Sequence, residues 1–362
     1  MKISIPKERL PGEERVGLTP AGIGLLVKDG HKCFVEGGAG AGAGFDDYDY
    51  ERMGATLVYD GEELYAQGSL ILKVLRPTPE EIEWMPNGQS LMCFLGLPQI
   101  PDEEIKQMQN KRITALAYEM IRKAKHDFPI LKPVSEVAGR MAPYIAGSLL
   151  MRQNGGRGIL LNGVPGVSAG DVVILGSGTV GQNAARAFLG LGAKVFMLSR
   201  SLDRLRSIDN QFQGRVTTMI DHDFNVAHVT RFADVVIGAV RNPGKRAPVI
   251  ITRQMLRSMR KGSVIIDFTI DHGGCAETSR PTTFANPTYT EEDIVHYCVP
   301  NVPGAVPRTS TQAFNNAAWS YVRHLAEMGV TSAIAQNEAL RRGVVMRNGE
   351  IIDDTSISYN VL

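Results

Sequence analysis

One stretch constrains the fold of this chain more than any other, an apolar run that ends in a glycine-rich turn. Val172–Leu175 is followed by Gly176-Ser177-Gly178-Thr179-Val180-Gly181. The run predicts a buried strand, and Val180–Leu189 predicts a helix directly after the turn. Backbone N–H groups at such a helix start attract anions, and the G-x-G-x-x-G spacing is typical of a pyrophosphate site. The residues from Gly176 to Gly181 therefore predict a dinucleotide-binding site.

The end of the next predicted strand distinguishes between two forms of such a dinucleotide. Ala193–Leu198 predicts the strand, Ser199-Arg200-Ser201 follows it, and Arg204 lies just beyond. An NAD site usually carries Asp or Glu at this place to hold the ribose 2′-hydroxyl, whereas hydroxyl and guanidinium groups suit a 2′-phosphate. We therefore expect NADP(H) in preference to NAD(H). In the alternative interpretation, Arg200 is a solvated surface residue and Asp203 contacts the ribose.

Composition argues against several other classes of protein. The chain has 362 residues, of which 43% are hydrophobic and 21% charged, values that are ordinary for a globular protein of two domains. Its net charge of +1 gives no reason to expect nucleic acid or a membrane surface as a partner. The four cysteines are widely spaced and form no Cys-x-x-Cys. We therefore expect reduced thiols, a cytoplasmic location and no metal site.

Short apolar runs alternate with helical segments along the chain. One series extends from Lys2–Ile5 to Ile113–Tyr118, and a second extends from the glycine turn to Ser263–Asp267. Such βαβ series predict an α/β fold with two Rossmann-like domains and mostly parallel sheets. Local signals fix some boundaries: Thr19-Pro20 begins a helix that Gly30 ends, and Asn348-Gly349 predicts a hairpin.

Two long helices are expected to connect the domains. One extends from Ser135 to about Gln153, and Ser310–Met328 returns the chain to the first domain. The first domain is then discontinuous, with residues 1–130 and 307–362 forming a substrate domain. Residues 131–306 form the dinucleotide-binding domain. An interdomain cleft is the expected place for a substrate.

Segments in both domains resemble the alanine dehydrogenase and pyridine-nucleotide transhydrogenase family. They cover nearly the whole chain in family order, and include Ile5-Pro6-Lys7-Glu8, Ala117-Tyr118-Glu119, Ser135-Glu136-Val137-Ala138-Gly139-Arg140, the glycine turn, Ile270-Asp271-His272-Gly273-Gly274-Cys275 and Ser279-Arg280-Pro281-Thr282-Thr283. The Ser135 and Ser279 segments look more like those of the soluble alanine dehydrogenases. The resemblance implies hydride transfer between a nicotinamide and C2 of a small carboxylate substrate. It also implies a homo-oligomer, commonly a hexamer.

The resemblance places two functional groups on residues that are present. Arg15 matches the family's arginine that binds the substrate carboxylate, and Asp271 matches an aspartate beside nicotinamide and substrate. Without the resemblance, Arg15 could be a surface residue of a charged run, and Asp271 a turn former. The adjacent His272 could carry a proton or be a structural histidine.

Two other family groups are replaced. The resemblance places the family's lysine at Leu75 and its histidine at Gly96. Lys73 is expected on the same strand face as Leu75, where it either approaches the substrate or keeps a partly buried stem and a solvated tip. The loss of a cation and an imidazole predicts a substrate other than pyruvate, either a 2-imino acid or a bulkier 2-oxo acid.

Further contacts are expected near strand ends and in segments that the family places close to the cofactor. Glu119 follows a strand and either faces the substrate or serves as a loop carboxylate. The remaining predicted cofactor contacts are Ser135, Ala239, Val240, Arg241, Ile270, Asp271, Asn301 and Val302, with Asn301 also near the substrate.

Two functions are compatible with the sequence. The first is an NADP(H)-dependent oxidoreductase that interconverts a 2-oxo or 2-imino acid and an amino acid. The second is a cofactor-binding, transhydrogenase-like module without substrate chemistry of its own, since that domain also lacks the lysine and the histidine. The presence of Arg15 and Asp271 favours the enzyme.

Overall fold

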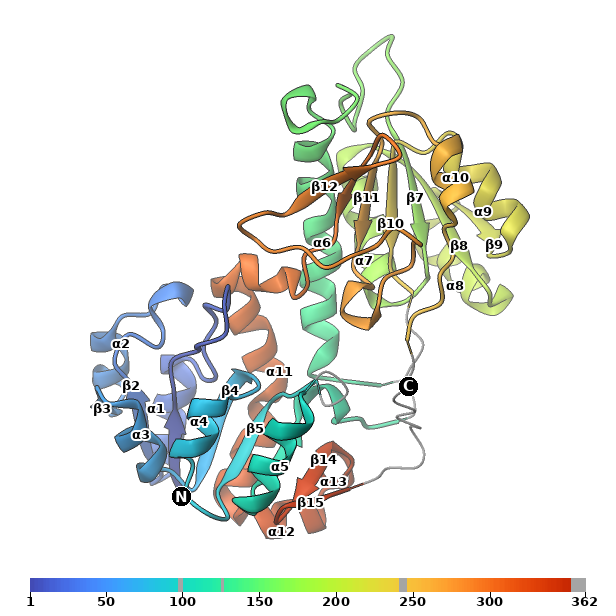
Figure 1. Cartoon of the computed structure of the whole chain (residues 1–362). Helices are drawn as coiled ribbons and strands as arrows, with labels where there is room; N and C mark the ends of the chain where they lie inside the picture. Colours follow the sequence, from blue (N-terminus) through green and yellow to red (C-terminus); the bar gives the residue numbers. More distant parts are fainter. Residues whose placement is uncertain (97–99, 125–126, 241–245, 353–362) are drawn as a thin grey trace. The chain divides into compact units, whose positions relative to one another are not determined.

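The computed structural model describes residues 1–96, 100–124, 127–240 and 246–352. The chain divides into two compact units (Figure 1). Unit 1 comprises Met1–Val134 and Gly304–Val361, and unit 2 comprises Ser135–Pro303. Each unit contains one mostly parallel β-sheet with helices on both faces, which confirms the α/β class predicted from the alternating pattern.

The sheet of unit 1 has eight strands in the order β15-β14-β6-β5-β4-β1-β2-β3. Strands β1 to β6 are parallel to one another, whereas β14 pairs antiparallel with β6. β14 and β15 form the antiparallel hairpin that Asn348-Gly349 predicts. The strands are β1 (Lys2–Ile5), β2 (Lys32–Glu36), β3 (Thr56–Val58), β4 (Leu70–Leu75), β5 (Ser90–Phe94), β6 (Thr114–Ala117), β14 (Val344–Arg347) and β15 (Glu350–Ile351).

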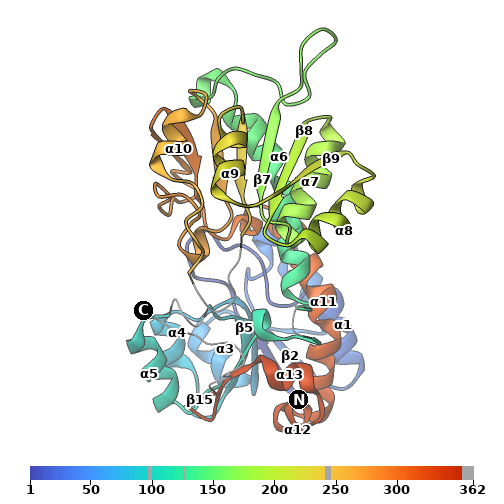
Figure 2. The ribbon, with the colours of Figure 1, turned by 90° about the vertical axis from the view of Figure 1, so that its right-hand side faces the viewer.

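Helices cover both faces of this sheet (Figure 2), and a hydrophobic layer lies on each face. Side chains of α3 (Gly61–Gln67), α4 (Pro79–Trp84) and α5 (Asp102–Asn110) pack on one face. The layer on the other face contains side chains of α1 (Pro20–Lys28), α2 (Asp47–Arg52), α11 (Pro307–Met328), α12 (Val330–Gln336) and α13 (Glu338–Gly343). Helix α1 begins as predicted, because the Thr19 side chain accepts a hydrogen bond from the Gly22 N–H and proline occupies the first turn.

Unit 2 has a seven-stranded sheet in the order β12-β13-β11-β10-β7-β8-β9, parallel except for the β12–β13 pair. Its helices α7 (Thr179–Leu191) and α8 (Leu202–Phe212), with most of α6 (Leu131–Leu149), pack on one face; α9 (Asp223–Thr230) and α10 (Arg253–Ser258) pack on the other (Figure 2). The strands are β7 (Asp171–Leu175), β8 (Lys194–Ser199), β9 (Val216–Ile220), β10 (Val235–Gly238), β11 (Val264–Asp267), β12 (Thr288–Glu291) and β13 (Ile294–Tyr297).

Alternation along the strands explains why both faces of the second sheet are covered. Val172 and Ile174 of β7 pack in the layer of α6, α7 and α8, whereas Val173 and Leu175 pack in the layer of α9 and α10. Successive side chains point to opposite faces of a sheet, so a continuous apolar run supplies both layers. β7 lies inside the sheet between β10 and β8, so the glycine turn stands at the carboxyl ends of the parallel strands.

The structure departs from the predicted elements at the ends of both long helices and in one hairpin, and α11 begins at Pro307, three residues before the predicted Ser310. The long helix α6 begins four residues earlier than the predicted Ser135 and ends at Leu149 rather than near Gln153. The β12–β13 hairpin was not predicted. Its turn residues Glu292 and Asp293 both have positive φ angles, of 52° and 60°, but they carry none of the Asn-Gly signal that normally marks such a turn.

Glycine substitutions in α7 test how closely the turn packs on the helix. A Cβ atom at Gly181 would collide with the Gly176 carbonyl oxygen, which is backbone and cannot move away cheaply. Gly181→Ala should lower the free energy of unfolding by about 1–3 kcal/mol in a urea titration. Gly190→Ala in the same helix meets no atom within 4 Å and should be neutral or stabilising by up to about 1 kcal/mol. Equal effects of the two substitutions would contradict the close packing.

Candidate functional site

The three glycines of the turn serve three different purposes. Gly176 has a φ of 108°, and a Cβ there would collide with the Ala239 carbonyl. Gly181 lets α7 approach the turn closely, as described above. A Cβ at Gly178 would meet nothing within 4 Å, so the space beside this backbone is open. These are the roles expected when glycines form a tight turn, admit a pyrophosphate and pack a helix against its strand.

The start of α7 has features that suit an anion. Gly178 is its N-cap residue and supplies no side-chain cap to the first turn. The N–H groups of a helix start need a partner, and an anion also interacts favourably with the helix dipole. A Cβ at Gly139 of α6 would collide with the Val180 carbonyl, so the two helices are in close contact. Ser135 lies one turn before Gly139 on the same side of α6.

The predicted 2′-phosphate segment divides into buried hydroxyls and exposed guanidinium groups. The Ser177 hydroxyl donates to the buried Ser199 hydroxyl at 2.8 Å, and Ser201 caps α8 by accepting from the Arg204 N–H at 3.3 Å. The side chains of Arg200 and Arg204 are exposed. Burial raises the pKa of Asp221, and the charge of Arg200 acts in the opposite direction, so Arg200 lies near the end of β9.

The Asp271 segment forms a 3₁₀ turn, η5 (Ile270–His272), beyond the end of β11. Asp271 is an exposed residue, but surrounding protein removes part of the hydration of its carboxyl group. This burial raises its pKa to about 6, while a hydrogen bond from the Asn301 backbone lowers it and the charge of Asp267 raises it further. A carboxyl group with this pKa can exchange a proton near neutral pH.

The other residues predicted around this turn lie in different environments. Ile270 and Val302 are buried, whereas His272 is exposed. Asn301 adopts a left-handed conformation with a φ of 52°, which asparagine tolerates better than most residues. The Ala239 N–H donates to the Leu175 carbonyl beside the glycine turn, and Val240 is half-buried. Arg241 lies outside the described residues.

Arg15 of unit 1 is a buried residue, so the surface interpretation is wrong. Only 1% of its side chain is exposed. Its Nε and Nη2 atoms donate to the two carboxylate oxygens of Glu13, at 2.7 and 2.5 Å. This bidentate contact fixes the plane of the guanidinium. Two parallel N–H···O bonds of this kind are the usual way in which arginine recognises a carboxylate.

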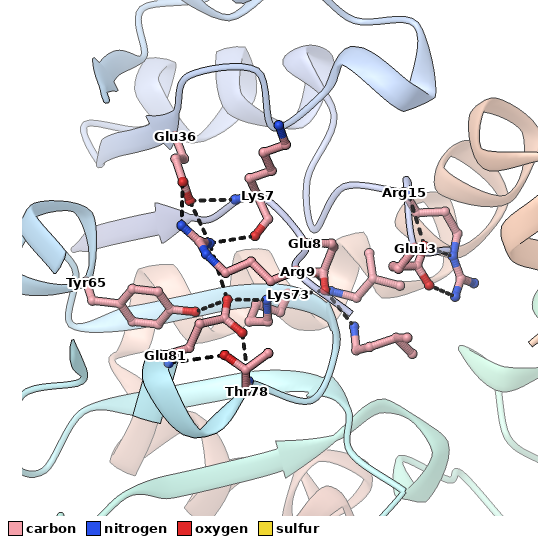
Figure 3. A network of polar contacts seen from close by, with 12 residues as sticks. Lys7, Glu8, Arg9, Glu13, Arg15, Glu36, Tyr65, Lys73, Thr78 and Glu81 are labelled. Atoms are coloured by element: carbon pink, nitrogen blue, oxygen red, sulfur yellow. Dashed lines mark hydrogen bonds and ion pairs between the residues drawn. The ribbon is translucent and has the colours of Figure 1, made fainter. Parts of the chain in front are cut away.

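Lys73 is the centre of a buried network of charges (Figure 3). Its Nζ lies 2.7 Å from Glu81 Oε1 and 3.2 Å from Glu8 Oε2, and none of its side chain is exposed. Burial by itself would lower the pKa of Lys73, but the two carboxylates raise it above its ordinary value. Glu81 also accepts from the Tyr65 hydroxyl at 2.9 Å. The solvated-tip interpretation of Lys73 is therefore wrong.

The prediction that Lys73 and Leu75 share a strand face is also wrong. The β4–β5 register shifts between Leu72 and Leu75, which interrupts the alternation. Lys73 contacts Glu81 of α4, whereas Leu75 packs against the layer on the opposite face that also contains Val74. Leu75 then lies opposite Phe94 of β5, and both side chains are half-buried.

Two carboxylates, the buried Glu8 and the half-buried Glu119, hold the backbone at Leu75 and Gly96. Glu8 accepts from the Val74 N–H at 2.6 Å and from the Leu75 N–H at 3.4 Å. Glu119, which follows β6, accepts from the Leu95 N–H at 3.1 Å and the Gly96 N–H at 2.7 Å. The structure thus gives Glu119 a backbone-holding role at the carboxyl ends of β5 and β6. The contribution of Glu8 was not predicted, because it depends on contacts with a strand distant in sequence.

Together, the two Rossmann-like sheets and the open glycine turn define a nucleotide-binding protein of the dehydrogenase type. No helix in the described part of the chain is long and apolar enough to cross a membrane. Residues 4–138 match the family model "Alanine dehydrogenase/PNT, N-terminal domain", and residues 142–354 match the corresponding C-terminal domain. The chain belongs to the alanine dehydrogenase/PNT family of oxidoreductases.

Similar proteins support this assignment along the whole chain. The alanine dehydrogenase of Halomonas elongata is 45% identical over 97% of this chain and 94% of its own length, and that of Bacillus subtilis is 43% identical over 97% and 92%. A solved L-alanine dehydrogenase superposes with a TM-score of 0.94 at 40% identity, covering 98% of both chains. A transhydrogenase from Sinorhizobium meliloti shares the fold, with a TM-score of 0.82 at 22% identity over 98% of this chain and 100% of its own.

Removal of the Lys73 charge tests the buried network. Lys73→Met leaves Glu8 and Glu81 buried without their shared cation, and should lower the free energy of unfolding by about 3–5 kcal/mol. The matched control is Arg206→Met, which breaks an exposed ion pair with Asp203 and should cost at most about 1 kcal/mol. Both values come from urea unfolding monitored by circular dichroism. A loss below about 1 kcal/mol for Lys73→Met would show that the network contributes little.

Proposed function

We propose that this protein is an NADP(H)-dependent oxidoreductase that interconverts a 2-oxo or 2-imino acid and an amino acid. The observation that carries the proposal is the open glycine turn at the start of α7, in a chain 45% identical to an alanine dehydrogenase. The nicotinamide of a bound cofactor would supply or accept the hydride. The residues of this chain would bind the carboxylate and handle the accompanying proton.

Two residues are assigned to these tasks. Arg15, whose guanidinium plane is fixed by Glu13, would hold the substrate carboxylate. Reduction of an imino acid adds a hydride to C2 and leaves the new amine to be protonated. Asp271, with a pKa of about 6, would offset the cationic charge of the iminium or exchange its proton. The exposed His272 is the alternative proton carrier.

The preference for a phosphorylated cofactor rests on the residues after β8. No carboxylate occupies the strand end, where Ser199 and Arg200 stand. Arg200 and Arg204 are exposed and can turn toward a 2′-phosphate. Asp203, the alternative ribose contact, lies 3.1 Å from Arg206 in an exposed ion pair.

We further propose that the substrate is not pyruvate or alanine. Leu75 and Gly96 stand where the family resemblance expects a lysine and a histidine. Leu75 lies opposite Phe94, whose ring centroid is 5.1 Å from that of Tyr118 and 6.1 Å from that of Phe314. This apolar end of the sheet suits a larger substrate side chain. An iminium carbon is already electrophilic and needs less assistance from a cation than a ketone does.

Homo-oligomeric assembly and a cytoplasmic location stay predictions.

The substrate hypothesis can be tested by restoring the missing pair. Wild-type protein should oxidise NADPH with a bulky 2-oxo acid and an amine, and only weakly with pyruvate and ammonium. Leu75→Lys combined with Gly96→His should raise kcat/KM for pyruvate by about 10²-fold or more, the scale of general acid–base assistance. Leu75→Met with Gly96→Ala is the control, because it imposes the same strain at Gly96, whose φ is 60°, without adding a donor. Efficient use of pyruvate by the wild type would overturn the hypothesis.

Cofactor choice is tested at Arg200. Arg200→Ala should raise the Kd for NADPH by about 10–100-fold, because one charge-assisted hydrogen bond to the 2′-phosphate is lost. The Kd for NADH should stay nearly unchanged. The matched control is Arg206→Ala, because Arg206 is also an exposed arginine and lies on α8, shortly after Arg200. Fluorescence titration of the reduced cofactors measures both constants. Equal effects on the two cofactors would argue against 2′-phosphate recognition by Arg200.

A further inference from the structure

Asp267 is a buried carboxylate at the carboxyl end of β11, and only 1% of it is exposed. Its Oδ1 accepts from the Thr269 N–H at 2.9 Å. Its Oδ2 accepts from the Cys275 N–H at 2.8 Å and from the Ser279 hydroxyl at 2.6 Å. The donors lie on both sides of residues 270–274, so one carboxylate holds the two ends of the segment that carries Asp271.

The surrounding backbone is shaped to accept this carboxylate. A Cβ at Gly238 of β10 would lie 2.7 Å from Asp267 Oδ1 and would collide with the Cys275 sulfur. Within the segment, the Gly273 N–H donates to the Ile270 carbonyl and the Gly274 N–H to the Thr269 carbonyl. These short-range bonds form the turn, but they do not attach it to the sheet. The bonds to Asp267 attach both ends of the turn to the end of β11, and the Ala247 N–H also donates to the His272 carbonyl.

We propose that Asp267 is a positioning residue that fixes the Asp271 turn on the end of β11. Asp267 acts through Asp271 and need not touch substrate or cofactor. The proposal rests on the proposed function only in its prediction about turnover. Its prediction about the Asp271 carboxyl group holds for the protein without any substrate.

The charges around Asp271 decide what a substitution at Asp267 would do. Asp267 from β11 raises the pKa of Asp271 after burial has already raised it, and the Asn301 backbone lowers it. Arg246 lies against Gly273, and His272 belongs to the same turn. The thiols of Cys275 and Cys298 lie near Asp267, and burial raises the pKa of each. Loss of the Asp267 charge should therefore lower the pKa of Asp271.

The test compares Asp267→Asn with Ser279→Ala. Asp267→Asn removes the charge and disturbs the turn, so the pKa of Asp271 should fall from about 6 toward the ordinary aspartate value, and kcat should fall at least tenfold. Ser279→Ala removes one hydrogen bond but keeps the charge, so kcat should fall severalfold with the Asp271 pKa unchanged. Carbon-13 NMR of the carboxyl groups gives the pKa, with the Asp271 signal assigned by its absence in Asp271→Asn.

Asp234→Asn is the matched control, because Asp234 is also a buried carboxylate of unit 2 that accepts a backbone N–H, from Asp171. It should leave both the pKa of Asp271 and the pH profile unchanged. In active protein, the kcat limb that follows Asp271 should move to lower pH in Asp267→Asn. An unchanged Asp271 pKa in folded Asp267→Asn, or unchanged kcat in both variants, would overturn the proposal. If wild-type protein turns over no carboxylate, the proposed function fails, while the NMR titration still tests whether Asp267 acts on the Asp271 carboxyl group.

Discussion

The structure depends on carboxylates, two of them buried and one half-buried, that accept backbone N–H groups where parallel strands end. A sheet ladder stops at such an end, and its last N–H groups need partners that the sheet no longer supplies. Glu8 provides them at the end of β4, Glu119 beyond β5, and Asp267 beyond β11. Ligands of open α/β sheets bind beside these strand ends. The same carboxylates therefore fix the backbone segments that the proposed function uses.

Burial of these acids requires compensation. Glu8 shares Lys73 with Glu81, and burial still raises the pKa of Glu8 despite that cation. Arg15 and Glu13 form a second buried pair. Such pairs add little net stability, but removal of one partner leaves an uncompensated charge in the interior. Their value is geometric, because they hold a guanidinium plane or a strand end in one orientation.

Several features were predictable because short segments specify them. Thr19 and Pro20 fix a helix start, Asn348-Gly349 fixes a hairpin, and the glycine spacing fixes the strand–turn–helix unit. The β12–β13 hairpin was missed because Glu292 and Asp293 carry no turn signal. The prediction that Lys73 and Leu75 share a strand face failed because the register shift in β4 depends on the pairing of β4 with β5.

The sequence alone determined the α/β class, the position of the dinucleotide turn and the polar residues that stand at strand ends. These properties follow from the spacing and alternation of residues within short segments of the chain. Only the tertiary structure decided which carboxylate pairs with Lys73, that Arg15 is buried against Glu13, and that Asp267 holds the turn of Asp271. Those outcomes depend on packing between segments and on the loss of hydration that packing brings, and neither is contained in any single segment.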